Sequence, residues 1–310
     1  MSDGFYKANW PKDSLYIDCF VHEVVNFRYH WHPDDFEINI LLQGQQYFCR
    51  GKDNHLLKAG DVVVVSPNVG HASYGQDKNT VSLVIHFSSS ALKQIVPKGA
   101  SLSFDACCSD QDKKNDTRYM RLKDACARLI LTISENKEYS SYISKAYSEM
   151  IISILCECFS PRITYDAPEI DEDTQKAMRV IMAYIEENFR EKISLDDIAS
   201  ITQYNRTYIS TLFHKAVGIT FYEYLMRVRL QNAIKDLCTT DEKLTDIALS
   251  NGFSDLKSFN KRFKEMLSCL PSEYKHKLMN DNTSIVATGR RYLPCDDPNI
   301  IVSLRNCLLI

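Results

Sequence analysis

The chain has 310 residues, of which 45% are hydrophobic and 25% charged, and only 10 Gly and 9 Pro. This composition excludes collagenous, low-complexity and disordered proteins and provides enough chain for two domains with separate cores. The net charge is −3, yet residues 192–279 hold 13 Lys and Arg against 10 Asp and Glu. A basic segment in an acidic chain points to a polyanionic partner.

Neither export nor membrane insertion is indicated. The opening residues, MSDGFYKANW, lack a basic and apolar leader, and no run approaches about 18 consecutive apolar residues. The 11 cysteines are odd in number and show no C-x-x-C spacing. We therefore expect reduced thiols and a cytoplasmic protein with no membrane partner.

Residues 15–87 consist of short β-rich runs separated by turn signals. The runs are EINILLQGQQYFCR, HLLKAGDVVVVSPNVGHASY and VSLVIHF, with a polar turn at residues 51–54 between the first two. Short strands at this spacing, with no helical period between them, predict an antiparallel sandwich or barrel. We assign residues 1–117 to this first domain.

The period changes at residue 118. Apolar residues then recur at three- and four-residue steps up to residue 159, which predicts two amphipathic helices joined near residues 135–139. We assign a helical hairpin to residues 118–160. Residues 161–174 are acidic, contain two prolines and lack apolar periodicity, so they are predicted to be a linker.

Residues 175–279 are helical in pattern throughout and contain a duplicated unit. In the first copy, Ser194 and Asp197 form a capping-box pattern that starts a short helix, and a polar turn at 202–205 leads to a second helix. About fifty residues later KLTDIALSNGFSDLKSFNKRFKEM repeats the pattern, so that DDIA corresponds to TDIA. Each copy is predicted to be a helix-turn-helix, with a long helix at about 221–237 between them.

The duplicated unit resembles the AraC/XylS family of bacterial transcription regulators. The resemblance covers about residues 193–275, and its most specific part is IALSNGFSDLKSFNKRFKEM followed by PSEYK. It implies that both second helices enter successive major-groove segments of double-stranded DNA. Where the family usually has Gly after the second recognition helix, this chain has Ser268, so we expect a small loss of local stability and an unchanged fold.

Helical spacing separates the residues that face DNA from those that form the core. Asn suits a bidentate contact with adenine, Lys suits guanine or phosphate, and Thr and Ser mostly hold the backbone. The alternative is a solvated charged face. The residues predicted to face DNA are Arg206, Thr207, Ser210, Thr211 and His214 in the first unit and Lys257, Asn260, Lys261 and Lys264 in the second.

The first domain resembles the cupins. The segment from His30 to Glu37 with Gly44 resembles the first cupin motif, and Gly60-Asp61, Pro67 and His71 resemble the second. In metal-containing cupins the three His and the Glu bind a metal, whereas in a sensor they orient a ligand at the barrel mouth. We expect a small polar effector, of the carbohydrate type, and no metal or other cofactor. The residues predicted to bind it are His30, His32, Glu37, His71, Trp31 and Tyr47, since a sugar needs fixed polar groups and an aromatic face, with Phe36 and Tyr74 nearby.

The hairpin resembles the family's dimerisation element. Its apolar stripe packs either on the barrel or against a second subunit; we expect the latter, through Leu129, Ile133, Ile151 and Ile154. The predicted protein is thus an α+β homodimeric regulator comprising a cupin-like sensor, a helical hairpin, a linker and a double helix-turn-helix, with RNA polymerase as a further candidate partner. The role of residues 280–310 is left open.

No catalytic residues are predicted, because G-x-S-x-G, Walker A and H-E-x-x-H motifs are all missing from the sequence. Two alternatives remain at this point. A metal-dependent cupin enzyme would require bound metal and turnover, and a constitutive DNA-binding dimer would require that no small molecule alter its affinity for DNA.

Overall fold

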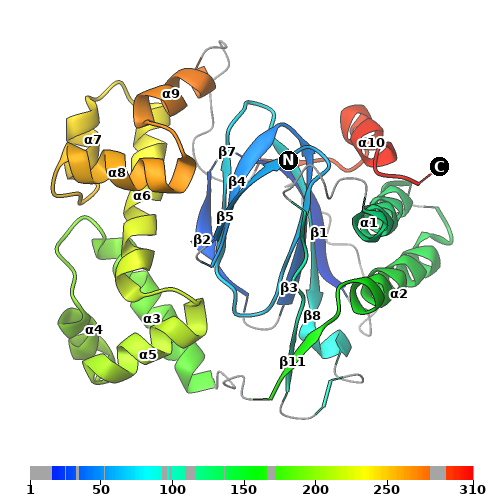
Figure 1. The fold of residues 1–310 in the computed structure, drawn as a ribbon, viewed down its shortest axis with the longest axis horizontal. Helices are drawn as coiled ribbons and strands as arrows, with labels where there is room; N and C mark the ends of the chain where they lie inside the picture. The colour runs from blue at the N-terminus through cyan, green and yellow to red at the C-terminus, as the bar shows by residue number, and fades with distance from the viewer. Residues whose placement is uncertain are drawn as a thin grey trace.

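The structure is a computed structural model that describes residues 16–24, 26–32, 35–51, 53–92, 96–97, 100–108, 116–135, 137–165, 172–279 and 291–309. It consists of a β-rich N-terminal domain with three helices along one side and an all-helical domain along the other (Figure 1). The predicted α+β class is confirmed.

Two large sheets and one two-stranded sheet are described in the N-terminal domain. One is six-stranded in the order β10-β6-β3-β8-β1-β12, one is four-stranded in the order β2-β7-β4-β5, and β11 pairs with β9. The strands are β1 (Tyr16–Glu23), β2 (Asn26–His30), β3 (Asp35–Gln43), β4 (Gln45–Arg50), β5 (Asp53–Lys58), β6 (Val62–Val65), β7 (His71–Gly75), β8 (Val81–Ser88), β9 (Ser101–Ser103), β10 (Cys107–Cys108), β11 (Arg162–Thr164) and β12 (Arg291–Leu293), with a short 3-10 helix at Ser89–Leu92.

The two sheets face each other, and their inner surfaces carry both apolar and polar side chains. Phe48 lies inside with Leu41 and Val63, and the amide of Gln46 donates to Asn39 Oδ1 at 3.1 Å across the interior. At the β3–β4 turn, Gly44 has a φ of +75°, and a Cβ there would approach Thr80 Oγ1 to 2.7 Å. Only glycine fits this turn.

Helices α1 (Thr117–Glu135) and α2 (Ser140–Cys158) cover the outer face of the six-stranded sheet. They correspond to the predicted hairpin, but its apolar stripe does not face outward. Leu129 and Ile151 are fully buried and Ile154 is 4% exposed, all in one core with the sheet, and Ile133 packs against that core. The prediction that these four residues form an intersubunit stripe was therefore wrong, because the sheet had to bury its own outer apolar face.

The predicted linker also contains regular structure. Residues 162–164 form β11, which pairs with β9, and the next helix begins at Glu172. Residues 166–171 of that linker lie outside the described part of the chain.

The last part of the chain returns to the N-terminal domain. Strand β12 pairs antiparallel with β1, with Val21 opposite Leu293. Helix α10 (Pro298–Arg305) packs against α1 and β3 and buries Ile300 and Leu304 in their core. Residues 280–290 lie outside the described residues, but residues 291–309 pack on the N-terminal domain (Figure 1).

The helical domain contains α3 (Glu172–Asn188), α4 (Leu195–Thr202), α5 (Arg206–Val217), α6 (Phe221–Thr239), α7 (Leu244–Ser250), α8 (Leu256–Leu267) and α9 (Pro271–Met279). Ser194 and Asp197 form the predicted capping box at the start of α4. Ser268 ends α8 in the left-handed conformation, with a φ of 54°, so it occupies the position where the resemblance placed Gly. No described helix is long and apolar enough to cross a membrane.

The helical domain packs directly on the outer face of the four-stranded sheet. Tyr29, Cys49, Ala72 and Tyr74 from that sheet share one buried core with α3 to α9. The hydroxyl of Tyr274 donates to the Gly75 carbonyl at 2.7 Å. The interface thus combines apolar contacts with directed hydrogen bonds, as a stable interdomain contact does.

Candidate functional site

The second helices of the two helix-turn-helix units are α5 and α8. Each of them is capped at both ends by residues that lie next to it in the sequence. Asn205 accepts from the backbone N–H of Tyr208 at 2.8 Å, and Asp255 accepts from that of Ser258 at 2.6 Å, which caps the two N-termini. Gly218 and Ser268 end the helices in left-handed conformations. Both helices are 12 residues long, so the repeat seen in the sequence has matched geometry.

The structure separates the inner and outer faces of these helices as helical spacing predicts. Ile209, Phe213, Phe259 and Phe263 are fully buried. Asn260 is only half-exposed, and its Oδ1 is buried without a hydrogen-bond partner in the described residues. The exposed residues are Arg206, Thr207, Ser210, Thr211, His214, Lys257, Lys261 and Lys264.

These exposed cations hold few intramolecular partners. Arg206 lies 3.3 Å from Asp196, and Lys261 lies 3.9 Å from Glu265, with all four side chains largely exposed. Surface ion pairs of this kind contribute little to stability, so the cations can exchange them for phosphates. One aromatic residue was missed by the sequence analysis: Tyr208, 42% exposed on α5, lies against Tyr204 with ring centroids 4.7 Å apart.

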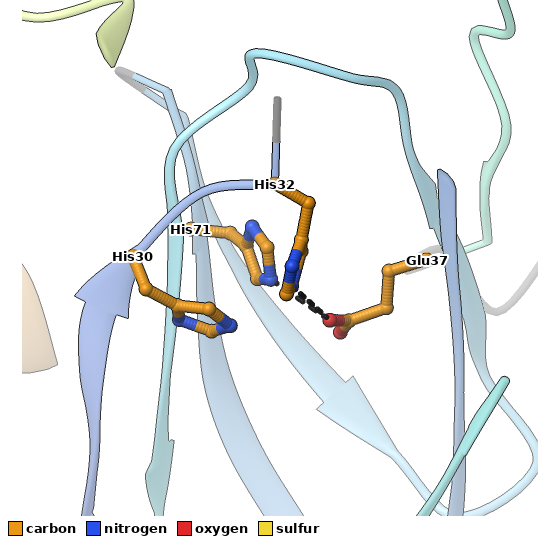
Figure 2. Close-up of side chains that lie close together, drawn as sticks. All are labelled: His30, His32, Glu37 and His71. Atoms are coloured by element: carbon orange, nitrogen blue, oxygen red, sulfur yellow. Dashed lines mark hydrogen bonds and ion pairs between the residues drawn. The ribbon is translucent and has the colours of Figure 1, made fainter. Parts of the chain in front are cut away.

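A second cluster lies inside the N-terminal domain, where three histidines converge on one carboxylate (Figure 2). Strand register brings them together, because His30 on β2 pairs with His71 on β7. Glu37 lies on β3, in the opposite sheet, and His32 follows β2. The ligand atoms of these four side chains all lie within 4.8 Å of one another.

Glu37 Oε2 is the centre of the cluster. It lies 2.9 Å from His71 Nε2, 3.0 Å from His86 Nε2 and 3.5 Å from His32 Nε2. His86 was not identified from the sequence, although it faces Glu37 directly across the β3–β8 register. The sequence feature that could have identified His86 is the period-two alternation of VSLVIHF, which places this residue on the inner face of the strand.

Burial and contacts set the charge states in this cluster. Burial by itself raises the pKa of Glu37, but the charge of His71 and hydrogen bonds from the histidines hold that pKa well below its usual range. Burial, with the neighbouring His71, lowers the pKa of His30 well below its usual range. Glu37 is therefore a carboxylate and His30 a neutral imidazole near neutral pH.

The remaining ring nitrogens match the donor set of a metal site. The Nδ1 atom of His30 lies 2.9 Å from the carbonyl of Arg28. His71 Nδ1 lies 3.1 Å from the Val69 carbonyl, but the Nε2 atom of His71 already faces Glu37 Oε2 at 2.9 Å. A neutral ring that donates Nδ1–H to a carbonyl presents an Nε2 lone pair, which is how protein histidines are oriented toward metals. The Nε2 atom of His30 is buried without a hydrogen-bond partner in the described chain, and that of His32 has only its 3.5 Å ion-pair contact with Glu37. Three imidazoles and a carboxylate fit a first-row divalent cation.

The structure does not bring Trp31 and Tyr47 into this cluster. Both pack against the core shared with the helical domain, on the outer side of the four-stranded sheet. The prediction that they bind the effector was wrong, because Tyr47 precedes the inward Phe48 and neighbouring strand residues point to opposite faces. Tyr74 also belongs to the interdomain core, and Phe36 lies in the core beneath α1 and α2. The rings that do touch the cluster include Phe27 on His30, with centroids 4.6 Å apart, Phe48 on His71, at 5.8 Å, and Phe20 on His86, at 5.8 Å.

Comparison with known proteins identifies both halves of the chain. Residues 22–147 match the model of the AraC-like ligand binding domain, and residues 198–277 match that of a helix-turn-helix domain. The HTH-type transcriptional activator AarP of Providencia stuartii is 41% identical over 95 residues, which cover 31% of this chain and 70% of AarP.

Other relatives share only part of their length with the chain. An uncharacterized HTH-type transcriptional regulator of Staphylococcus aureus strain COL is 30% identical over 157 residues, or 50% of this chain; the chain spans about a fifth of that relative's length. Among solved structures, ToxT from Vibrio cholerae O395 aligns with 85% of this chain and 98% of its own at 15% identity and a TM-score of 0.38. The C-terminal domain of the response regulator yesN from Fusobacterium nucleatum is 31% identical over 32% of this chain and 98% of its own, with a TM-score of 0.31.

Proposed function

This chain belongs to the AraC family of transcription regulators, with an N-terminal ligand-binding domain and a DNA-binding helix-turn-helix domain, and from that premise we propose how its two sites work together. The N-terminal barrel binds a small polar effector at the histidine and glutamate cluster. The exposed faces of α5 and α8 bind two successive major-groove segments of DNA. One observation carries the proposal: cluster residues and interdomain residues alternate along the same strands.

Strand alternation connects the two sites. His30 and His71 point into the barrel, while their neighbours Tyr29 and Ala72 lie in the interdomain core. On β4, Phe48 stacks on His71 and the next residue, Cys49, faces the helical domain. Consecutive strand residues are only about 3.4 Å apart, so a displacement of the inner face moves the outer one.

The sheet touches both recognition helices near their C-terminal ends. The Tyr29 hydroxyl donates to the carbonyl of Val217, the last residue of α5, at 3.4 Å. Cys49 Sγ lies 3.6 Å from the sulfur of Met266 on α8. An effector that binds one arrangement of β2 and β4 better than another would therefore change the relative placement of α5 and α8.

The effector that we propose is of the carbohydrate type. Its hydroxyls would exchange hydrogen bonds with Glu37 and the surrounding imidazoles, and Phe27 and Phe48 would supply the apolar face. Glu37→Gln should weaken the effector response without abolishing DNA binding, because the DNA-facing residues lie on the other domain. A gel-shift series with candidate sugars tests this: an unchanged response in Glu37→Gln contradicts the assignment.

A metal ion is the second candidate for the same cluster, favoured by the unpartnered Nε2 atom of His30 and by the three imidazoles around one carboxylate. Such an ion would act as a fixed positive charge in the barrel and would draw Glu37 and the imidazoles together. Elemental analysis of freshly purified protein distinguishes the candidates. A stoichiometric first-row metal that is lost in His30→Ala would replace the sugar proposal.

We further propose a homodimer, which would double the length of DNA contacted. Since the inner face of the hairpin is buried, we place the contact on the outer face of α2 and at its N-cap. Tyr139, Tyr142, Ile143 and Met150 are exposed there, at 69%, 81%, 44% and 52%. Tyr139, Ile143 and Met150 follow four- and seven-residue steps, so they form one stripe suited to packing against its own copy.

A further inference from the structure

A cavity that is partly open to solvent lies between the two domains, outside the barrel. Here Asn54 of β5 meets α6 and α8 around a cavity of about 200 Å³. The Asn54 amide donates to the Glu265 carbonyl at 3.4 Å, so both domains contribute to the wall. The volume is below the 300–1,000 Å³ typical of drug-sized ligands, which suits a small metabolite.

Arg227 is the unusual residue of this cavity. Its side chain is only 3% exposed, its Nε lies 3.1 Å from Glu223 Oε1, and its Nη2 donates to the Gly51 carbonyl at 2.9 Å. The guanidinium carbon lies 4.4 Å from the centre of the Tyr29 ring. Nη1, however, is buried without an acceptor in the described residues. A buried guanidinium N–H without an acceptor is unfavourable, so an incoming acceptor would bind there.

The other groups of the cavity define the rest of the ligand. Arg262 Nη1 lies 3.5 Å from Glu223 Oε2 and 3.2 Å from Glu265 Oε2, so two guanidiniums and two carboxylates alternate. A simple anion would lie beside both carboxylates and a simple cation beside both guanidiniums, and like charges at such distances repel. A ligand that carries both charges can place each of them beside a group of the opposite sign. Met226, Leu230 and Met266 supply its apolar wall.

We propose that this interdomain cavity binds a free α-amino acid with an apolar side chain. Its carboxylate accepts from Arg227 Nη1, its ammonium group donates to Glu223 and Glu265, and its side chain lies against the methionines and Leu230. Such a ligand bridges α6 and α8 to the sensor sheet through the wall that Asn54 forms. The site is separate from the barrel cluster, so it would give the regulator a second chemical input.

Isothermal titration of the full chain with L-methionine and L-leucine tests the proposal, with propionate and propylamine as ligands that carry one charge each. The amino acids should bind at least ten times more tightly than either single-charge compound. Arg227→Lys keeps the positive charge but removes the planar fork, and should weaken amino-acid binding at least tenfold. If Arg227→Lys fails to fold, Met226→Trp provides the second test, because it fills the cavity from a half-buried position and should abolish binding.

Two control variants make the outcome specific. Tyr222→Trp adds a similar ring on α6 at a position 51% exposed and should leave binding unchanged. Glu37→Gln serves a different purpose, because it shows whether the amino acid binds in the barrel instead. The absence of amino-acid binding at millimolar concentration would overturn the proposal, as would equal binding by Met226→Trp and the wild type. Binding lost in Glu37→Gln but kept in Met226→Trp would overturn it too, and would assign the amino acid to the barrel effector site.

Discussion

The salt dependence of DNA binding gives the sharpest test of the proposed DNA-binding surface, and it requires no knowledge of the operator. Among the side chains that the structure describes on α5 and α8, four Lys and Arg residues are classed as exposed: Arg206, Lys257, Lys261 and Lys264. If each neutralises one phosphate, the logarithm of the affinity falls with the logarithm of salt concentration with a slope of about −3.6. Replacing Lys257 and Lys261 by Ala should reduce this slope to about −1.8.

The difference is large enough to measure by fluorescence anisotropy with any duplex. Between 50 and 200 mM salt, the wild type should lose affinity about 150-fold and the double variant about 12-fold. The matched control is Lys137→Ala with Lys145→Ala, which removes the same charge from exposed positions in the N-terminal domain. If both pairs of substitutions change the slope equally, only net charge matters and the reasoning from helix faces is refuted.

Further predictions concern stability, assembly and pH. Leu304→Ala should lower the free energy of unfolding by about 3 kcal/mol, because that side chain is fully buried. Val302→Ala, at a site 59% exposed, should lower it by less than about 0.5 kcal/mol. Thermal melts of the two variants compare these effects. Ile143→Asp should produce a folded monomer in sedimentation, and Ile151→Asp should unfold the chain because its site is fully buried. The hydrogen bond from the backbone N–H of Ser258 lowers the pKa of Asp255 in the folded protein. The stability that this cap supplies is therefore fully present above the ordinary Asp pKa of about 3.9. It is lost as the pH falls through the lower pKa that Asp255 has in the folded protein. Asp255→Asn should flatten that dependence in melts between about pH 2 and 5, because Asn caps helices without titrating.

A specific result would contradict each of these predictions. Equal melts for the Leu304 and Val302 variants would mean that α10 is not docked in solution. A dimer that survives Ile143→Asp would exclude the outer face of α2 as the contact. An acid transition that persists unchanged in Asp255→Asn would assign that transition to other carboxylates.

The helix-turn-helix units could be predicted in detail because their determinants are local. Ser194 and Asp197 form a cap within four residues, and the spacing of Phe259 and Phe263 marks the inner face of α8. The convergence of His30, His71 and Glu37 was likewise predicted, in this case from motif resemblance. These features depend on residues close together in the sequence or on a known motif, so they can be predicted from the sequence alone.

Other features could not be predicted, because they depend on how distant segments pack together and a local sequence pattern does not contain that information. Trp31 and Tyr47 were assigned to the wrong face because the β2 register shifts between Phe27 and His30, and because either face of that sheet can be covered. An amphipathic hairpin can bury its apolar stripe within one subunit or between two subunits. The apolar pattern around Ile151 fits both arrangements, so the sequence does not distinguish them. The docking of residues 291–309 depends on a pairing between distant segments, for which no local signal exists.

That last pairing has a consequence for how the protein is made. Arg291 on β12 and Glu23 on β1 lie 268 residues apart in the chain, yet they form an ion pair at 3.3 Å. At about 5–20 residues per second, a ribosome needs on the order of tens of seconds to pass from one to the other. During that interval β1 is an open sheet edge, while the whole helical domain emerges and can fold on its own local contacts. The DNA-binding half should therefore be finished first, and the sensor, although it comes first in the gene, should be the last part of the protein to close.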